Sequence, residues 1–451
     1  EAVMRPGKGE KGMGSYIPTT EEQRQRMLET VGLTSTEGLF AALPEEVKLK
    51  GELQLPKGLS ELGAARKMED YAEENRIFRH IFRGAGAYDH YIPSIVKEVV
   101  SKEEFVTAYT PYQAEISQGL LQSIFEYQTM ICELTGLDAA NASVYDGASA
   151  AAEGVFMCRE RKRTRVLVSE TTNPQVTEVI KTYCHGRQAV VEMVPARDGS
   201  TDLEALKSML DDTVACFYVQ QPNFYGILED GRACAEAVHE RGGKLIMGCN
   251  PIALAIVETP GECGADVAVG EGQPLGLPLS FGGPYLGFMA ASRDMMRKLP
   301  GRIVGETVDS RGNRGFVLTL QAREQHIRRE KAGSNICSNE ALCALTASVY
   351  LSAMGPEGLT QTAVLCASKA HYLQKELEKA GLPPVYKKEF FHEFVTASPV
   401  DGKRLLGALE EKGFLGGLLL PDGNLLWCAT EKNSREEMDE LVRLVKEVCG
   451  Q

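Results

Sequence analysis

The sequence predicts an α/β protein with a mostly parallel, buried β-sheet. Between residues 76 and 330, short apolar runs alternate with amphipathic stretches of helical length, which is the pattern of βαβ units. No internal repeat or low-complexity linker interrupts this pattern. An architecture of this kind occurs in many enzyme families and does not by itself give a function. The runs predicted as strands are residues 166–168, 189–194, 215–219, 244–248, 267–270 and 285–290.

An N-terminal arm of short helices is predicted for residues 1–75. Thr19 and Glu22 have the spacing of a capping box, in which two side chains satisfy backbone N–H groups at a helix start. Residues 1–12 are polar and glycine-rich, and Met13 would be a natural first residue. The sequence therefore leaves open whether that first segment is native.

Two domains are predicted after the arm, a large α/β domain at residues 76–330 and a small α/β domain at residues 331–451. The small domain repeats the mixture of helical and strand-like patterns over a shorter length. Its predicted elements are a long helix at 339–354, strands at 393–396 and 425–429, and a last helix with a capping box from Ser434 to Glu437.

Composition limits the classes of function. The formal net charge of −13 argues against nucleic acid and anionic membrane surfaces as partners, because both are negatively charged. The sequence has no apolar run of membrane-spanning length and no secretory signal, so we expect an intracellular, non-secreted protein. The twelve cysteines show neither C-x-x-C nor zinc-site spacing, and we expect reduced thiols and no metal.

Residues 109–119 form an unusually polar loop. Two tyrosines, two amides, a carboxylate and two hydroxyls surround Pro111, and Gly119 leads into a helix predicted at 120–134. Such a density of directional hydrogen-bonding groups suits a polar ligand. A polar loop at a helix start, with Ser117 as the cap, explains the same residues, and their chemistry leaves both interpretations open.

Two further segments are candidates for function. Residues 141–153 predict a small-residue turn that opens a helix, where unpaired N–H groups can hold a phosphate, although close packing through alanines gives the same pattern. Residues 323–335 are rich in charge. They are typical of the solvated face of a helix, and they also contain Arg323 and His326, which suit a site.

Long stretches of the sequence resemble one family. The run YTPYQAEISQGLLQSIFEYQTMICELTGLDAANAS begins at Tyr109, and GAGAYDHYIP at 84–93 and QAREQHIRREKAGSNIC at 321–337 also match. These segments resemble the glycine decarboxylase P-protein of the glycine cleavage system, and the resemblance runs from Tyr16 to the C-terminus. The chain length is similar to that of subunit 1, the alpha subunit, in organisms that divide this protein in two.

The resemblance implies a fold-type I PLP-dependent transferase fold, with a mostly parallel seven-stranded sheet in the large domain. It implies an enzyme that decarboxylates glycine, releases CO2 and passes the aminomethyl group to the lipoyl arm of the H-protein. In the divided form it implies an α2β2 heterotetramer, in which subunit 2, the beta subunit, carries pyridoxal phosphate (PLP). The divided form also implies a bacterial, cytoplasmic protein.

Two positions indicate that this chain lacks the cofactor chemistry. A PLP enzyme of this fold needs a lysine that forms a Schiff base with the cofactor. In the family that lysine precedes a glycine-rich stretch ending in Gly-Gly-Pro, and counting back from Pro284 places Gln273 there. No lysine occurs between Lys244 and Lys298. Met247 stands where the family has the aspartate that protonates the pyridine nitrogen, so we expect no PLP on this chain.

The resemblance also implies that polar residues of this chain are lent to the partner's active site, because fold-type I sites form at subunit interfaces. Arg323 and His326 are expected at the mouth of that site or at the lipoyl channel. The residues expected inside it are Tyr88, Tyr109, Thr110, Tyr112, Gln113, Glu115, Ser117 and Gln118.

Two alternatives share part of this pattern. A structural or regulatory pseudoenzyme that only stabilises its partner would also lack the lysine and the aspartate, but it would not need the polar loop. An independent PLP enzyme would need another lysine, such as Lys331, to point into a pocket. We favour an enzyme subunit that works without a cofactor of its own.

Overall fold

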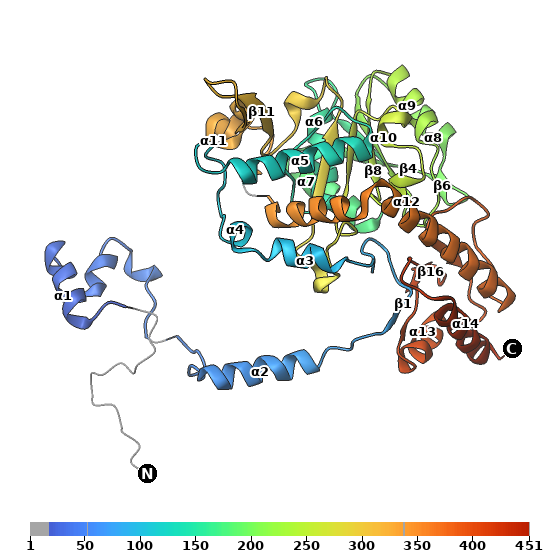
Figure 1. Ribbon diagram of the computed structural model, residues 1–451, viewed down its shortest axis with the longest axis horizontal. Helices are drawn as coiled ribbons and strands as arrows, with labels where there is room; N and C mark the ends of the chain where they lie inside the picture. The colour runs from blue at the N-terminus through green and yellow to red at the C-terminus, as the bar shows by residue number, and fades with distance from the viewer. Residues whose placement is uncertain (1–17, 52, 337–338, 451) are drawn as a thin grey trace, which may run out of the picture. The chain divides into compact units, whose positions relative to one another are not determined.

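The structure is a computed structural model that describes residues 18–51, 53–336 and 339–450. The chain divides into two compact units between Arg76 and Ile77 (Figure 1). Residues 1–12 and Met13, where the sequence leaves the natural start open, lie outside the described residues.

The N-terminal unit consists of short helices. Its capping box joins Thr20 and Gln23, one residue later than the predicted pair Thr19 and Glu22, because Thr20 has the extended backbone of an N-cap. Glutamine returns the second hydrogen bond as glutamate would. The helices are α1 (Glu21–Thr30), η1 (Thr36–Phe40), η2 (Glu45–Val47) and α2 (Glu61–Glu73).

A seven-stranded sheet forms the centre of the second unit, in the order β2-β10-β9-β8-β7-β3-β4. The last five strands of this order are mutually parallel, and β10 is antiparallel to both of its neighbours. The predicted α/β fold with a mostly parallel seven-stranded sheet is confirmed. The strands are β2 (Ala139–Ala140), β3 (Arg165–Ser169), β4 (Val190–Val194), β7 (Val214–Gln221), β8 (Lys244–Cys249), β9 (Val267–Glu271) and β10 (Gly287–Ala291).

Helices cover both faces of this sheet, because its strands carry apolar side chains on both sides. On one face, α6 and α7 pack against residues such as Val166 and Ile246. On the other face, α8 and α9 cover Phe217 and Leu245, and α5 and α12 cover Phe288. The helices are α5 (Gln118–Thr135), α6 (Gly147–Cys158), α7 (Pro174–Gly186), α8 (Leu203–Met209), α9 (Gly231–Glu240) and α12 (Ala341–Lys379).

Helix α12 is bent at Gly355, which has a φ of 62° that favours glycine, and Pro356 follows directly. The helix predicted at 339–354 ends at this bend, and the segment beyond it was not predicted. Figure 1 shows α12 running from beside α5 to the C-terminal helix α14, and contacts with both helices support this path.

The C-terminal part contains a three-stranded sheet in the order β13-β16-β15. Both predicted strands and the predicted capping box of Ser434 and Glu437 are present. The elements are β13 (Glu393–Thr396), α13 (Gly402–Glu411), β14 (Phe414–Leu415), β15 (Leu418–Leu419), β16 (Leu425–Cys428) and α14 (Arg435–Cys449). Strand β1 (His80–Ile81) pairs with β14, which brings the start of the second unit to its C-terminal part.

Shorter elements connect these layers. The predicted boundary between a large and a small domain, at residues 330/331, stays a prediction. None of the helices that the structure describes is long and apolar enough to cross a membrane. The connecting elements are α3 (Ser94–Val100), α4 (Glu103–Val106), β5 (Ala196–Arg197), β6 (Ser200–Thr201), η3 (Ala253–Ala255), α10 (Pro260–Cys263), η4 (Ser280–Gly282), η5 (Met296–Lys298), β11 (Val304–Val308), β12 (Arg314–Leu318), η6 (Gln321–Arg323), α11 (Gln325–Arg328) and η7 (Arg329–Lys331).

Candidate functional site

A hollow of about 630 Å³ lies at the carboxyl ends of the parallel strands, where open α/β sheets usually bind ligands. Tyr218, Gly248 and Gly270 contribute to it from three neighbouring strands, and the start of α6 lines it as well. Among its described lining residues there are three carboxylates and no lysine, arginine or histidine. The carboxylates belong to Asp146, Glu271 and Glu340. The hollow is therefore acidic.

The start of α6 is the helix start predicted as a phosphate site, and the chain's own carboxylates fill it. The N–H of Gly147 donates to Glu271 Oε2 at 3.0 Å, and the N–H of Ser149 donates to Asp146 Oδ1 at 2.7 Å. A Cβ on Gly147 would lie 2.8 Å from the backbone nitrogen of Glu271, so this close approach requires glycine. Two of the donors that would hold a phosphate are thus already used.

Glu271 is the centre of this arrangement. In addition to Gly147, it accepts hydrogen bonds from the N–H groups of Gln273 and Leu286, both at 3.0 Å. Burial raises the pKa of this carboxyl to about 7, while the three backbone donors act in the opposite direction. The sequence analysis missed Glu271. An acidic residue at the end of a predicted buried strand, two positions before Gln273, was the signal that could have found it.

Gln273, at the position expected for lysine, is 1% exposed and completely hydrogen-bonded. Its Oε1 accepts from the N–H of Tyr88 at 2.8 Å, and its Nε2 donates to the carbonyls of Tyr88 at 2.9 Å and Leu277 at 2.8 Å. The amide therefore pairs with the backbone of Tyr88 as a neighbouring strand would. Its role in this structure is to fix the segment that contains Tyr88.

Met247 does not face the hollow. Its side chain packs in the apolar cluster under α9, where a Cβ on Gly231 would lie 2.3 Å from its Cε. Successive side chains of a strand point to opposite faces, and the next residue, Gly248, lines the hollow. Met247 as the position of the missing aspartate stays a prediction, and of these two neighbours it is Gly248 that borders the hollow. Neither residue supplies a carboxylate.

PLP, the cofactor that the resemblance implies, does not fit these residues. The described lining of the hollow offers no lysine to bind it, and β8 has no carboxylate for its pyridine nitrogen. Glu271 and Asp146 use two of the N–H donors that a phosphate needs. Like charges close together in a partly buried site also repel a phosphate.

Tyr88 lies in this buried region and not on an exposed loop. Its hydroxyl donates to Glu393 Oε2 at 2.7 Å, and Glu393 also accepts from the N–H of Ala85 at 2.6 Å. Burial raises the pKa of Glu393 to about 7. The structure does not bring Tyr88 together with the other predicted site residues.

The loop at residues 109–119 exposes part of its polar groups. Tyr109 is 90% exposed, and the side chains of Thr110, Gln113 and Glu115 are exposed too. None of these four side chains has a hydrogen-bond partner in the part of the chain that the structure describes. They are therefore available to another molecule.

Other residues of the loop are held by their own chain. The guanidinium of Arg302 lies 5.0 Å from the ring centre of Tyr112, whose hydroxyl accepts a hydrogen bond from Asn339 Nδ2 at 3.1 Å. Gln118 binds the N–H and the carbonyl of Phe316 at 2.8 and 2.9 Å. Ser117 is the N-cap of α5, although its side chain makes no capping hydrogen bond.

The charged segment at residues 323–335 is not one solvated helix, because η6, α11 and η7 are separate short turns. Glu324 is buried and forms an ion pair with Arg302. Arg323 donates to the carbonyls of Leu299 and Gly301, and burial lowers its pKa. Arg302 thus joins this segment to the loop at 109–119.

His326 is half exposed, and its Nδ1 lies 3.6 Å from Glu324 Oε2. Lys331, the alternative cofactor lysine, is exposed and lines a different cavity from the hollow at the strand ends. The structure therefore brings Arg323, His326 and Tyr112 into one neighbourhood, and it leaves Lys331 away from the place where a fold-type I cofactor would lie.

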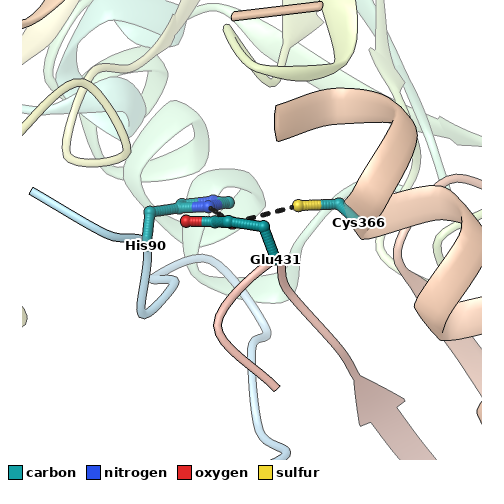
Figure 2. A group of neighbouring side chains, drawn as sticks. All are labelled: His90, Cys366 and Glu431. Atoms are coloured by element: carbon teal, nitrogen blue, oxygen red, sulfur yellow. Dashed lines mark hydrogen bonds and ion pairs between the residues drawn. The ribbon is translucent and has the colours of Figure 1, made fainter. Parts of the chain in front are cut away.

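One buried group has the composition of a metal site. Figure 2 shows His90, Cys366 and Glu431, whose ligand atoms all lie within 4.8 Å of one another. Glu431 Oε2 accepts hydrogen bonds from His90 Nδ1 at 2.7 Å and from the Cys366 thiol at 3.3 Å, and Oε1 accepts from the N–H of Tyr91 at 2.6 Å. Burial raises the pKa of the thiol. Hydrogen bonds explain this cluster as a polar link between α12 and the segments after β1 and β16, and we assign no metal to it.

Comparison with known proteins gives a consistent result. Residues 14–445 match the family "Glycine cleavage system P-protein". The chain is 47% identical to the probable glycine dehydrogenase (decarboxylating) subunit 1 of Desulfitobacterium hafniense, over 96% of this chain and 100% of that protein. It is 50% identical to the protein of the same name from Desulforamulus reducens, over 94% and 98% of the two chains.

Solved structures agree with the family match. A crystal structure of glycine decarboxylase (P-protein) of the glycine cleavage system, in inhibitor-bound form, superposes with a TM-score of 0.89 at 44% identity and covers 96% of this chain and 100% of that one. An aspartate aminotransferase from Thermus thermophilus, at 18% identity and a TM-score of 0.57 over 82% and 99% of the chains, shows the shared fold-type I architecture. The chain belongs to the glycine cleavage system P-protein family.

Proposed function

We propose that this chain is the subunit of a heteromeric glycine decarboxylase that does not itself hold PLP. With a second subunit it decarboxylates glycine, releases CO2 and transfers the aminomethyl group to the lipoyl arm of the H-protein. The name "subunit 1" of its relatives and the P-protein structure that resembles it support this reaction and a partner. PLP on that partner would supply the electron sink that glycine decarboxylation needs.

One observation supports most directly the proposal that this subunit binds no cofactor of its own. Glu271 occupies the helix start where a phosphate would bind, and Gln273 at the lysine position is bound to the backbone of Tyr88. Both side chains are fully used inside the chain. A chain with this hollow needs a partner that carries the cofactor.

The N-terminal unit supports a stable partner. Its own helices leave many of its large apolar side chains uncovered, and such surfaces are typically covered when a protein assembles. We infer an α2β2 heterotetramer in which subunit 2 covers them, and the cytoplasmic location stays a prediction. The exposed side chains include Leu39, Phe40, Leu43, Leu49, Leu53, Leu55, Leu59, Leu62 and Met68.

We assign the lent residues to the exposed part of the loop at 109–119. Tyr109, Thr110 and Gln113 have hydrogen-bonding groups that suit the glycine carboxylate or the cofactor phosphate in the partner's active site. Glu115 can hold or move a proton there. Tyr112, with its ring under Arg302, positions the loop.

Arg323 and His326 are proposed at the mouth of that shared site. Arg323 holds the carbonyls of Leu299 and Gly301, so it shapes the backbone at this place. His326 is exposed enough to meet a ligand or the lipoyl arm. A pseudoenzyme that only stabilises its partner would not need these exposed groups.

The test compares this chain alone, the second subunit alone and the reconstituted pair. Each sample receives PLP and is reduced with borohydride, and its glycine–bicarbonate exchange is then measured on an unreduced portion. We expect no covalently fixed PLP on this chain and exchange activity only from the pair. Fixation of PLP on this chain by itself would overturn the proposal. Full exchange by the second subunit alone would show that this chain is not part of the enzyme.

A further inference from the structure

A second cavity, of about 280 Å³, lies beside the C-terminal half of α6 and is lined by different residues from the hollow. Positive charge is concentrated around it, although the chain as a whole carries a net charge of −13. Six cationic side chains line the cavity against two carboxylates. The cations are Arg159, Arg297, Lys298, Arg323, Arg328 and Lys331.

The two carboxylates do not neutralise this charge. Glu324 is already paired with Arg302, which is not one of the cations that line the cavity. Glu153 is 3% exposed, and burial raises its pKa to about 7, so this carboxyl is partly protonated at neutral pH. The cavity keeps a surplus of positive charge.

Several of the cations lack an opposite charge within the described residues. Arg297 and Lys331 are exposed and have no ion pair there. Lys298 does form an ion pair, with Glu160 at the surface, but at the long distance of 3.9 Å. The Nε atoms of Arg159 and Arg323 are buried without a hydrogen-bond partner. Like charges held together around a concave surface destabilise the chain unless an anion joins them.

We infer that this cavity binds a small oxyanion of the phosphate class. Guanidinium groups match the geometry of phosphate oxygens in pairs, and lysine adds charge without strict geometry. A volume of about 280 Å³ suits a small ligand better than a folded peptide segment. The phosphate can come from a free ligand or, if the proposed function holds, from an anionic group that the partner subunit carries.

The test is a calorimetric titration of the full chain with inorganic phosphate at constant ionic strength. The variant Arg297→Gln/Lys331→Gln removes two exposed cations from the cavity. The control Lys403→Gln/Lys412→Gln removes the same charge from exposed positions in the C-terminal part. We expect the cavity variant to bind phosphate at least about tenfold more weakly than the wild type, and the control to stay within about twofold.

Two results would overturn the inference. The first is a wild-type chain that binds no phosphate. The second is equal binding by the wild type, the cavity variant and the control, since general attraction to positive surface would explain it. Because this titration measures binding and not turnover, its failure is distinct from a failure of the proposed function.

A second titration separates the two sources of the anion. The wild-type chain is first assembled with its PLP-loaded partner and then titrated with phosphate. Retained binding assigns the cavity to a free anion. Loss of binding on assembly, with the isolated chain still competent, assigns it to an anionic group of the partner. Either result keeps the cavity as a phosphate-class site.

Discussion

The hollow at the strand ends and the loop at residues 109–119 are both rich in polar groups, but they use them in opposite ways. In the hollow, Glu271 and Gln273 form their hydrogen bonds with the backbone of their own chain. In the loop, Tyr109 and Glu115 are exposed and have no partner in the described structure. Polar groups that are satisfied inside the chain indicate a structural role, and exposed unsatisfied ones indicate a surface for another molecule.

The largest effect is expected in the hollow. Glu271→Ala leaves three buried N–H groups without an acceptor, and we expect it to lower the free energy of unfolding by about 4 kcal/mol, measured by urea denaturation. Glu306→Ala on β11 is the control, because that carboxylate forms only an exposed ion pair, worth less than about 1 kcal/mol. Equal losses for the two variants would show that Glu271 is not an internal anchor.

The loop should respond in activity and not in stability. Tyr109→Phe and Glu115→Gln, each in the reconstituted enzyme, are expected to slow glycine–bicarbonate exchange by about 100-fold, because each removes a group that we propose lies at the partner's active site. Tyr91→Phe and Glu104→Gln change the same chemistry at other exposed positions and should have little effect. If the loop variants keep full exchange in an intact assembly, the loop is structural.

A third substitution distinguishes the internally hydrogen-bonded part of the loop from its exposed part. Gln118→Ala removes the two hydrogen bonds to the backbone of Phe316, and we expect a loss of about 2 kcal/mol in the free energy of unfolding. Gln122→Ala, one turn later on the exposed side of α5, should cost less than about 0.5 kcal/mol. Chemical denaturation of the two variants side by side measures both losses. If Gln118→Ala leaves the free energy of unfolding unchanged, the side chain of Gln118 belongs with the exposed groups of the loop.

The smallest effect concerns pH. The pKa of Glu271 is raised from 4.5 to about 7, so between these values the folded chain binds more protons at this side chain than the unfolded chain does. The contribution of this group to the free energy of unfolding therefore falls as pH rises from 5 to 8. Relative to Glu271→Gln, the wild type should lose about 1 kcal/mol between pH 6 and pH 7. A constant difference between the two proteins would mean that the pKa is not raised.

The fold was largely readable from the sequence because buried strands are marked by apolar runs. The six predicted runs became strands of the sheet, whereas β2 was missed because two alanines carry no pattern. The end of the predicted helix at 354 coincides with the bend at Gly355, but continuation beyond a Gly-Pro pair could not be expected from local propensity.

The site was less predictable, because its residues are defined by contacts that are distant in sequence. Gln273 was found through its spacing from Pro284, but its pairing with Tyr88 joins residues 185 positions apart. Glu271 looked like the end of a strand, and only the fold brings it to Gly147. Met247 was chosen by its spacing in the sequence, which does not show that its side chain points away from the hollow while Gly248 borders it.

The pairing of Gln273 with the backbone of Tyr88 has an evolutionary consequence. A single mutation back to lysine would remove that pairing, yet Glu271 would still occupy the helix start and no acid would face the hollow from Gly248. A cofactor site in this hollow would therefore need several substitutions together, and the first of them already removes hydrogen bonds that hold the chain.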